Sequence, residues 1–390
     1  MKEFHKPWFV ALGFMFLIKP GVVSNIPALS AVDIAFDVFR IFLIILTVVA
    51  LLVKPVKRKD PKMTAMLLIF VAEIWKIIAT ALEGHSYSGW GALMNTAGIV
   101  LFTYTCLIYD QRSFFEGASR TLGLYVIINA LTVLLFPDGM YSTTKYTENF
   151  FLSYRTAWFP VYLLAATVVL FNAAIYPSKR TKLWRGLTIC ALFLSVIWVW
   201  TATSIFCFTL AAIVFFVCWK FRKGNPVRAR WVLLVEAVVF VLMVIMKAQE
   251  RFSFILVDLL QKDITMTSRL RIWDNALYVV SNNLLTGIGN VGSEAMEMIL
   301  GYGATHAHNF FLDNTLRYGL IGLIFCLLPV IYTMTRSYKQ PMQGLINSCV
   351  FVALLTSYQV ECYMSIGYYI LPIYVVLCST ADIQKRRALR

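Results

Sequence analysis

Residues 265–319 read TMTSRLRIWDNALYVVSNNLLTGIGNVGSEAMEMILGYGATHAHNFFLDNTLRYG. The stretch contains Arg269 and Arg271, two of the four histidines of the chain, His306 and His308, and a glycine-rich segment. Apolar runs precede and follow it. A chain with this pattern is expected to fold as membrane segments joined by one large polar connection, and such a connection requires a function.

The composition predicts that lipid is the solvent. The chain of 390 residues is 59% hydrophobic, 15% aromatic and only 14% charged, far from the values of water-soluble globular proteins. Several runs reach the roughly 20 apolar residues that a helix needs to cross the hydrocarbon core. Continuous apolar runs, rather than strict alternation, favour helices over a β-barrel. We therefore predict an all-α polytopic membrane protein that forms a single integral membrane domain over residues 1–390.

The apolar runs predict about twelve transmembrane helices. About ten or eleven is the alternative, since the first and fifth runs are short and the turn between the seventh and eighth is tight. The predicted spans are 8–23, 33–53, 63–82, 90–109, 121–136, 155–176, 186–201, 203–219, 231–250, 309–335, 344–360 and 366–380. A large connection, residues 251–308, precedes the last three spans and is predicted to be the catalytic loop.

The positive charges predict the orientation of the chain. Lys and Arg accumulate on cytoplasmic loops, and most of the 35 Lys and Arg residues fall on alternate connections if the N-terminus is inside. This assignment places both termini in the cytoplasm and residues 251–308 outside. The net charge of +15 is then explained by topology and by anionic inner-leaflet lipid, so no nucleic-acid partner is expected.

Two arginines of the predicted outer loop are candidates for phosphate binding. Arg269 and Arg271 flank Leu270, and a guanidinium presents a planar fork of donors that suits phosphate oxygens at any relevant pH. The alternative is that they bind lipid headgroups or pair with Asp263 and Asp274. Residue type alone leaves both readings open.

His308 stands where the loop ends and the tenth span begins. An imidazole can take and return a proton near neutral pH, so His308 is a candidate base for an acceptor hydroxyl. The alternative is that it only caps the helix. His306 completes an HxH pair, but no third ligand is apparent in the sequence, so no metal site is predicted.

Two further features of the stretch have structural explanations. Asp313 and Arg317 lie four residues apart and are expected to pair on one helix face, because an unpaired charge near lipid is costly. The GxGxxG pattern at Gly287, Gly289 and Gly292 lacks a surrounding βαβ unit, so we read these glycines as turns rather than as a dinucleotide site.

Together, SRLRIWDNAL, NNLLTGIGNVG and HNFFLDNTLRYGLIG resemble the C-terminal signature of the O-antigen ligase and polymerase superfamily. In that signature an arginine four residues before a tryptophan precedes a glycine-rich turn and an HNxxLxxxxxxG helix start. The resemblance places the family's arginine on Arg269 and its histidine on His308, followed by Asn309, Leu312 and Gly319.

A second stretch, FFLSYRTAWFP at 150–160, looks like a segment of capsule polymerases and contains Arg155. Many ligases carry an arginine in a TGSR segment at an outer helix junction. The corresponding WVWTATSIFCF here keeps Thr201, Thr203 and Ser204 but has no arginine, unless Arg155 supplies the charge. These features favour a polymerase over a ligase.

The resemblance implies glycan transfer at the outer face of the cytoplasmic membrane from a polyprenyl-diphosphate donor to a glycan acceptor, without a metal ion or other cofactor. It implies bacterial inner-membrane localisation, and a chain-length regulator and a flippase as further partners. His308 and Arg269 are the predicted catalytic residues. The predicted diphosphate contacts are Arg271, Arg155, Asn309 and Arg317.

Two other functions remain open from the sequence. Ionisable residues inside predicted spans could form the midplane site of a lipid-linked-glycan flippase or secondary transporter. These residues are Arg40, Glu73, Lys76, Glu236 and Lys247. Glu73 and Lys76 are three residues apart and are expected to pair. A non-catalytic membrane scaffold is the third function.

Overall fold

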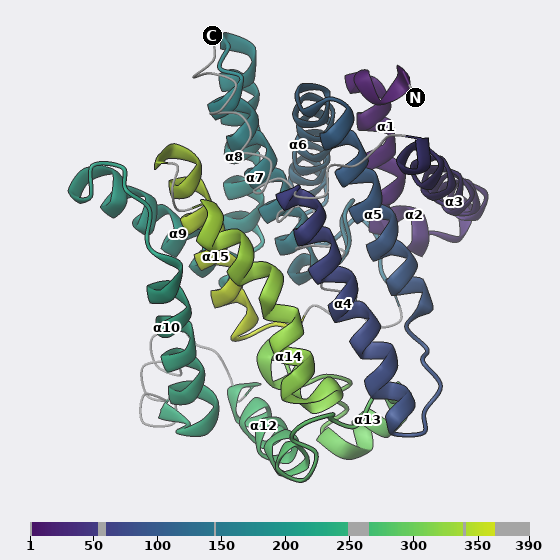
Figure 1. Ribbon diagram of the computed structural model, residues 1–390, viewed down its shortest axis with the longest axis vertical. Helices are drawn as coiled ribbons and strands as arrows, with labels where there is room; N and C mark the ends of the chain where they lie inside the picture. Colours follow the sequence, from purple (N-terminus) through teal and green to yellow (C-terminus); the bar gives the residue numbers. More distant parts are fainter. Residues whose placement is uncertain (1, 54–59, 144–145, 249–264, 338–340, 363–390) are drawn as a thin grey trace.

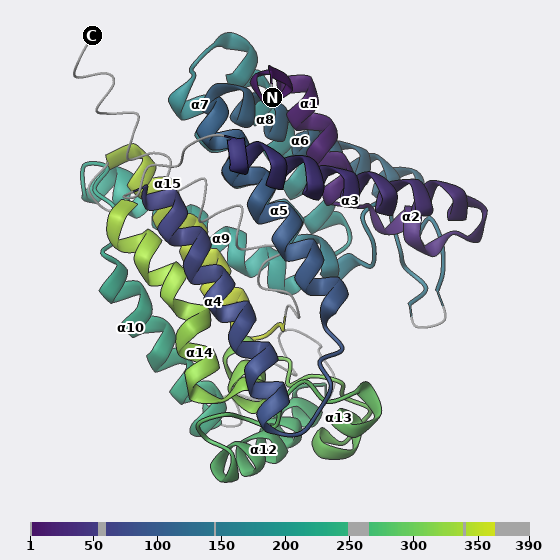
Figure 2. The same ribbon diagram turned by 45° about the vertical axis from the view of Figure 1, so that its right-hand side comes forward.

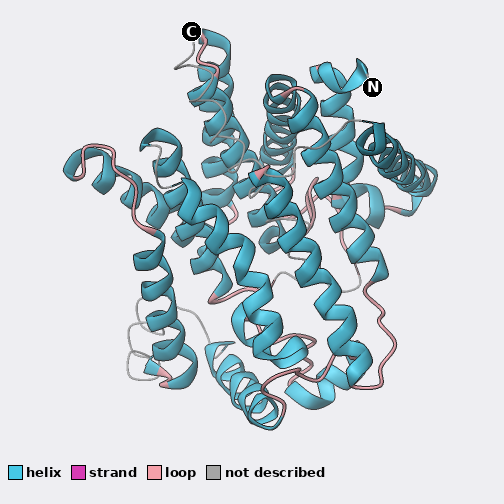
Figure 3. Cartoon of the chain, in the orientation of Figure 1, coloured by secondary structure: helices cyan, strands magenta, loops and turns pink. Residues whose placement is uncertain are grey.

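The computed structural model describes residues 2–53, 60–143, 146–248, 265–337 and 341–362. Nearly all of the described elements are helical, and the extended pairings among them are the isolated bridges Tyr141–Asn149 and Asn149–Tyr154 (Figure 3). Within these residues, nine helical segments are long and apolar enough to cross a membrane. This confirms the helical membrane class, although the exact count of twelve is not confirmed.

The helices follow one another with short connections. The α-helices are α1 (Pro7–Leu17), α2 (Gly21–Asn25), α3 (Ser30–Val53), α4 (Pro61–Leu82), α5 (Trp90–Tyr109), α6 (Gln111–Leu135), α7 (Phe159–Ile175), α8 (Lys179–Trp198), α9 (Ala202–Phe221), α10 (Ala229–Phe240), α12 (Thr265–Asn282), α13 (Ser293–Leu300), α14 (Phe310–Ser337) and α15 (Pro341–Tyr358). Shorter 3₁₀ turns are η1 (Lys2–His5), η2 (Pro27–Leu29) and η3 (Arg155–Trp158), and a π-helical turn, η4 (Val241–Ile245), extends α10.

Local chemistry explains where the helices differ from the predicted spans. The fifth span, predicted at 121–136, begins earlier at Gln111 because the carboxylate of Asp110 accepts from the Arg112 amide at 3.0 Å and caps the helix. The first span is split into α1 and α2, and Pro20, which cannot continue a helix, precedes α2. The span predicted at 366–380 lies outside the described residues.

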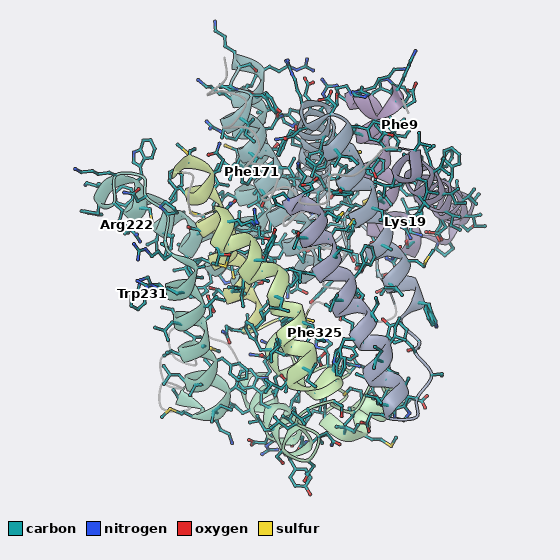
Figure 4. All side chains as sticks on the ribbon, viewed as in Figure 1. Phe9, Lys19, Phe171, Arg222, Trp231 and Phe325 are labelled. Atoms are coloured by element: carbon teal, nitrogen blue, oxygen red, sulfur yellow. The ribbon has the colours of Figure 1, made fainter. Side chains whose placement is uncertain are left out.

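The largest core packs around α6 and α7. Helix α7 is buried over most of its length, and Phe171, labelled in Figure 4, is fully buried there. Helices α1, α5 and α8 surround this pair, with aromatic contacts such as Phe115–Phe171 at 6.2 Å between ring centroids. A helix apolar on all sides is expected to lie inside a membrane bundle.

A second core forms where the predicted loop residues fold. Helix α12 buries Ile272, Trp273 and Ala276 on one face, against α13 and the start of α14. In Figure 1, α12 and α13 lie together at the lower end, whereas η1 and the start of α1 lie at the upper end. The turn between α9 and α10, marked by Arg222 in Figure 4, lies at the left edge, in the upper half of the molecule.

Helices α4 and α14 run side by side (Figures 1 and 2). The pair predicted between Glu73 and Lys76 is present on α4, buried, with 2.7 Å between Oε1 and Nζ. Trp75 Nε1 donates to the carbonyl of Tyr318 at 2.9 Å, which fastens α4 to α14 next to a break in the latter helix. Helix α4 thereby supports the segment that carries the predicted site.

Candidate active site

Helix α14 is broken at Gly319, and the glycine-rich segment fills the break. Gly319 has φ 68° and ψ −178°, a conformation that essentially only glycine adopts. The amides of Ile288 and Gly289 donate to the carbonyls of Leu316 and Arg317 at 3.0 and 2.7 Å. On the other side of the break, the Leu320 amide donates to Leu284 at 2.8 Å. The glycine-rich segment and the broken part of α14 are therefore hydrogen-bonded into one structural unit, residues 284–289 with residues 316–320, which we call the joint.

Glycine is required at this joint for space as well as conformation. Gly287 and Gly289 have φ of 72° and 75°, as expected for turns, whereas Gly292 does not have a positive φ. A Cβ on Gly287 would overlap the Arg317 backbone, and one on Gly319 would overlap the Leu285 carbonyl. The GxGxxG pattern is thus explained by helix–loop packing rather than by nucleotide binding.

Arg317 is buried and bonded inside the protein. Its Nε lies 2.9 Å from Asp313 Oδ2, which confirms the predicted pair, and its other nitrogens donate to the Thr305 carbonyl at 2.7 Å and to Asn290 Oδ1 at 3.4 Å. Asp313 Oδ1 accepts from the Ala307 amide at 2.9 Å. The pair holds the 305–307 loop against the glycine segment, and contact of Arg317 with a diphosphate remains a prediction.

His308 sits in a backbone conformation that few residues adopt. Its φ is 51°, in the left-handed region, and such positions persist where the surroundings enforce them, often at functional sites. Its amide donates to His306 Nδ1 at 3.3 Å, and the two rings are 4.1 Å apart. His308 is partly exposed.

Asn309 joins the histidine loop to the end of α15. Its Oδ1 accepts from the Leu312 amide at 3.0 Å and caps α14, while Nδ2 donates to the Gln359 carbonyl at 2.9 Å. The side chain is fully buried, so the direct donor contact predicted from the sequence remains a prediction. In this structure Asn309 positions His308.

Arg269 reaches the same turn from α12. Its NH1 donates to the Val360 carbonyl at 2.9 Å, next to the residue that Asn309 binds. One helical turn further along α12, Trp273 Nε1 donates to the Ala307 carbonyl at 2.8 Å, directly before His308. The structure therefore brings the Arg269 and His308 segments together at the end of α15.

Arg269 also lines a cavity of about 300 Å³, which the sequence alone does not reveal. Arg155 lies in the same lining, together with the turn between α8 and α9. The remaining described residues of the lining are Thr156, Phe159, Trp200, Thr201, Ala202, Thr203, Ser204 and Glu361. His308 is not one of the residues that line this cavity, but Asn309 connects it to Gln359, two residues before Glu361.

The cavity combines several kinds of group that can bind an anion. Arg155 forms an ion pair with Glu148 at 2.9 Å, both side chains being more than a third exposed, so its guanidinium is accessible. The first residues of α9, Ala202 to Ser204, line the cavity, and a helix N-terminus favours an anion. Two guanidinium groups and a helix N-terminus are features that suit an anionic group.

Arg271 faces a different partner. Its NH1 donates to the hydroxyl of Tyr302 at 2.9 Å, and the guanidinium lies 5.7 Å from the centre of that ring. Of the two candidates for a second diphosphate contact, Arg155 shares the cavity with Arg269 and Arg271 does not. The likeness of residues 150–160 to a capsule-polymerase segment was the signal that pointed to Arg155, whereas nothing in the sequence marked Trp200 or Glu361.

The charged residues of the transporter hypothesis do not meet in one site. Glu73 pairs with Lys76, Arg40 lies 3.3 Å from Asp37, and Lys247 lies 2.7 Å from Asp274. Glu236 in α10 accepts from Thr356 in α15 at 2.7 Å and from Nε2 of Gln359, directly after α15, at 3.1 Å. The first two pairs lie within single helices, whereas Lys247 and Glu236 bind partners on other segments, so these charges have separate local partners.

A helical integral-membrane protein with a cationic cavity beside a histidine-bearing loop is the class that this fold and site define. A family model described as O-Antigen ligase matches residues 189–327, which confirms the resemblance to the O-antigen ligase and polymerase superfamily. The matched residues include Arg269, His308 and Arg317 and leave out Arg155. No curated protein matches the chain. Among the described residues, no group of three or more His, Cys, Asp or Glu side chains is arranged to hold a metal ion.

Proposed function

We propose that this protein is a glycosyltransferase that joins oligosaccharide repeat units carried on a polyprenyl diphosphate, and so polymerises a polysaccharide. The observation that carries the proposal is the cavity that Arg155 and Arg269 share with the N-terminus of α9. A diphosphate presents several negatively charged oxygens, and two guanidinium groups can bind them with paired hydrogen bonds.

The same arginines explain how such a reaction would be accelerated. An acceptor hydroxyl oxygen attacks C1 of the donor sugar, the bond between C1 and the phosphate oxygen breaks, and the lipid diphosphate leaves with the electron pair. Negative charge on the leaving group grows along this path. Arg155 and Arg269 stabilise that charge more in the transition state than in the ground state, which lowers the barrier.

His308 is proposed to accept the proton of the attacking hydroxyl. Attack from the side opposite the leaving diphosphate inverts the configuration at C1. The tethers from Asn309 to Gln359 and from Trp273 to Ala307 would hold the imidazole near the arginine cavity. No metal ion is needed in this scheme, because arginines provide the positive charge.

The proposed active site faces away from the cytoplasm. Helix α8 begins with Lys179, Arg180, Lys182 and Arg185 and ends next to the cavity. Its 20 residues extend about 30 Å, the thickness of a hydrocarbon core. Helix α9 begins at the cavity and ends at Lys220 and Arg222. The cavity thus lies opposite the basic ends, which the positive-inside rule assigns to the cytoplasm.

Single substitutions test the proposal in cells that lack the native copy. Arg155→Ala and Arg269→Ala are expected to reduce polymer formation about 100-fold or more and to leave lipid-linked repeat units in the membrane. Arg271→Ala is the matched control, since it removes an arginine outside the cavity. Long chains formed at normal rates by both cavity variants, at normal protein levels, would refute the proposal.

A ligase that transfers a finished glycan to another acceptor is the second candidate. The match to the O-Antigen ligase model is the observation that favours it. The products separate the two. A polymerase extends glycans while they remain on the polyprenyl carrier, whereas a ligase moves a glycan of unchanged length to a different molecule. The cavity residues would serve both reactions, because Arg155 supplies a charge beside Thr201 and Ser204 in either case. The likeness of residues 150–160 to a capsule-polymerase segment favours the polymerase.

A further inference from the structure

Trp200 occupies a backbone position that normally belongs to glycine. Helix α8 ends with two reversed hydrogen bonds, from the Trp200 amide to the Ile197 carbonyl and from the Thr201 amide to the Val196 carbonyl, both 3.1 Å long. This is a Schellman ending, in which the residue after the helix must be left-handed. Trp200 is that residue, with φ 53°.

The protein gains no packing from placing an indole there. A bulky side chain in the left-handed region is strained, and glycine would end the same helix without that strain. Buried contacts could offset the strain, but the Trp200 side chain is 69% exposed. An unfavourable backbone position that holds an exposed aromatic ring points to a function of the ring itself.

The ring lies at the cavity of the proposed active site. Trp200 lines it with Arg155 and Arg269, and its neighbours Thr201, Thr203 and Ser204 contribute hydroxyl groups to the same lining. Trp198 has similar exposure, 59%, but is the last residue of α8 and is not one of the described residues that line the cavity. Trp198 therefore suits an anchor at the membrane interface, where tryptophan is common, and Trp200 has a separate location.

We propose that Trp200 is a binding platform for the donor sugar. This proposal rests on the proposed function. The sugar is bonded directly to the diphosphate, so an arginine-bound diphosphate places it beside the cavity wall. The flat indole offers an apolar face to the C–H groups of a pyranose ring, and the nearby hydroxyls suit its polar edge. These polar neighbours favour a sugar over the hydrocarbon of the prenyl chain.

The test compares two ligands on the full chain in lipid nanodiscs. One is the lipid-linked repeat unit extracted from cells that lack this protein, and the other is undecaprenyl diphosphate without a sugar. For Trp200→Gly we expect about tenfold weaker binding of the glycan-bearing lipid and less than about twofold change for the bare lipid. Trp200→Phe should restore part of the loss, and Trp198→Ala should change neither affinity.

A stability measurement separates this function from a structural role. Because glycine suits the left-handed position, Trp200→Gly should have a Tm equal to or above that of the wild-type protein. A lower Tm with equal loss for both ligands, or unchanged affinity for both, would overturn the platform. An equal loss of affinity for both ligands at unchanged Tm would show that the ring contacts the prenyl chain or the diphosphate. That result would also overturn the platform. If the wild-type chain binds neither lipid, the proposed function itself fails.

Discussion

The amide of Gly289 donates to the carbonyl of Arg317 at 2.7 Å, so the glycine-rich segment is hydrogen-bonded to the break in α14. The same arginine uses its side chain to hold Asp313 and the Thr305 carbonyl. Arg317 therefore links the glycine-rich segment, through its backbone carbonyl, to the loop before His308, through its side chain. Motifs far apart in the sequence act as a single support for the histidine loop.

Alanine at the joint is expected to destabilise the protein. A Cβ at Gly319 or Gly287 would overlap backbone atoms, and alanine would have to adopt the positive φ of either position, which together cost at least about 2 kcal/mol of unfolding free energy. Gly319→Ala and Gly287→Ala should lower Tm and the yield of monodisperse protein in detergent. Gly292→Ala is the matched control from the same motif, because nothing lies within 4 Å of its added Cβ. Equal Tm in all three variants would contradict the joint.

The buried pair of Asp313 and Arg317 predicts strong coupling between two substitutions. Removing either partner leaves a buried charge unpaired, at a cost of about 3–5 kcal/mol. The double variant Asp313→Asn, Arg317→Gln removes both charges and should be more stable than Arg317→Gln alone, because no charge is stranded. Thermal unfolding of the wild-type, both single variants and the double variant measures the coupling. Additive losses would show that the two side chains do not stabilise each other.

The sequence predicted those features that depend on burial in lipid or on residues close together in the chain. Apolar runs located the helices because a span needs about 20 such residues. The spacing of Asp313 and Arg317 predicted their pair because residues four apart share a helix face. The break at Gly319 was not predicted, since it lies inside a run that reads as one continuous span. Its cause is a segment elsewhere in the chain that supplies the missing hydrogen-bond partners.

The residues of the candidate site could be named only in part from the sequence, because their arrangement depends on segments far apart in the chain. Arg269, His308 and Arg155 were each named from motifs, but the sequence could not choose between Arg155 and Arg271. The choice depends on the way in which η3, α9 and α12 meet in space. Trp200 was missed because an exposed tryptophan near a helix end resembles an ordinary interfacial residue until its left-handed φ is known.

The two polar atoms of Asn309 predict separable effects. Asn309→Asp keeps an oxygen that can cap α14 but places a buried carboxylate against the Gln359 carbonyl in place of the donor, so it should cost about 3–5 kcal/mol. Asn309→Ala loses both hydrogen bonds without burying a charge and should cost about 1–3 kcal/mol. Both should lower polymer formation per folded molecule, because His308 loses its tether. Full specific activity of Asn309→Asp would show that the tether does not position the histidine.

Chemical labelling tests which side of the membrane the site faces. Glu294 in α13 and Asn225 in the turn after α9 are both exposed. Helix α13 lies at the lower end of the molecule in Figure 1, whereas Arg222, labelled in Figure 4 at the end of α9, lies in its upper half. In a background with all eight cysteines replaced by alanine, Glu294→Cys should react with a membrane-impermeant maleimide in intact cells. Asn225→Cys should react only after permeabilisation, because the basic residues around it belong in the cytoplasm.

The labelling result constrains the chemistry as well as the topology. Transfer at the outer face of the membrane by the arginine cavity requires that the cavity opens on that face. Thr203→Cys, at the start of α9, places a label in the cavity itself and should also react in intact cells. Bound undecaprenyl diphosphate should slow that reaction, since the diphosphate would occupy the space between Arg155 and Arg269. Labelling of Thr203→Cys only after permeabilisation would place the cavity in the cytoplasm and rule out transfer at the outer face.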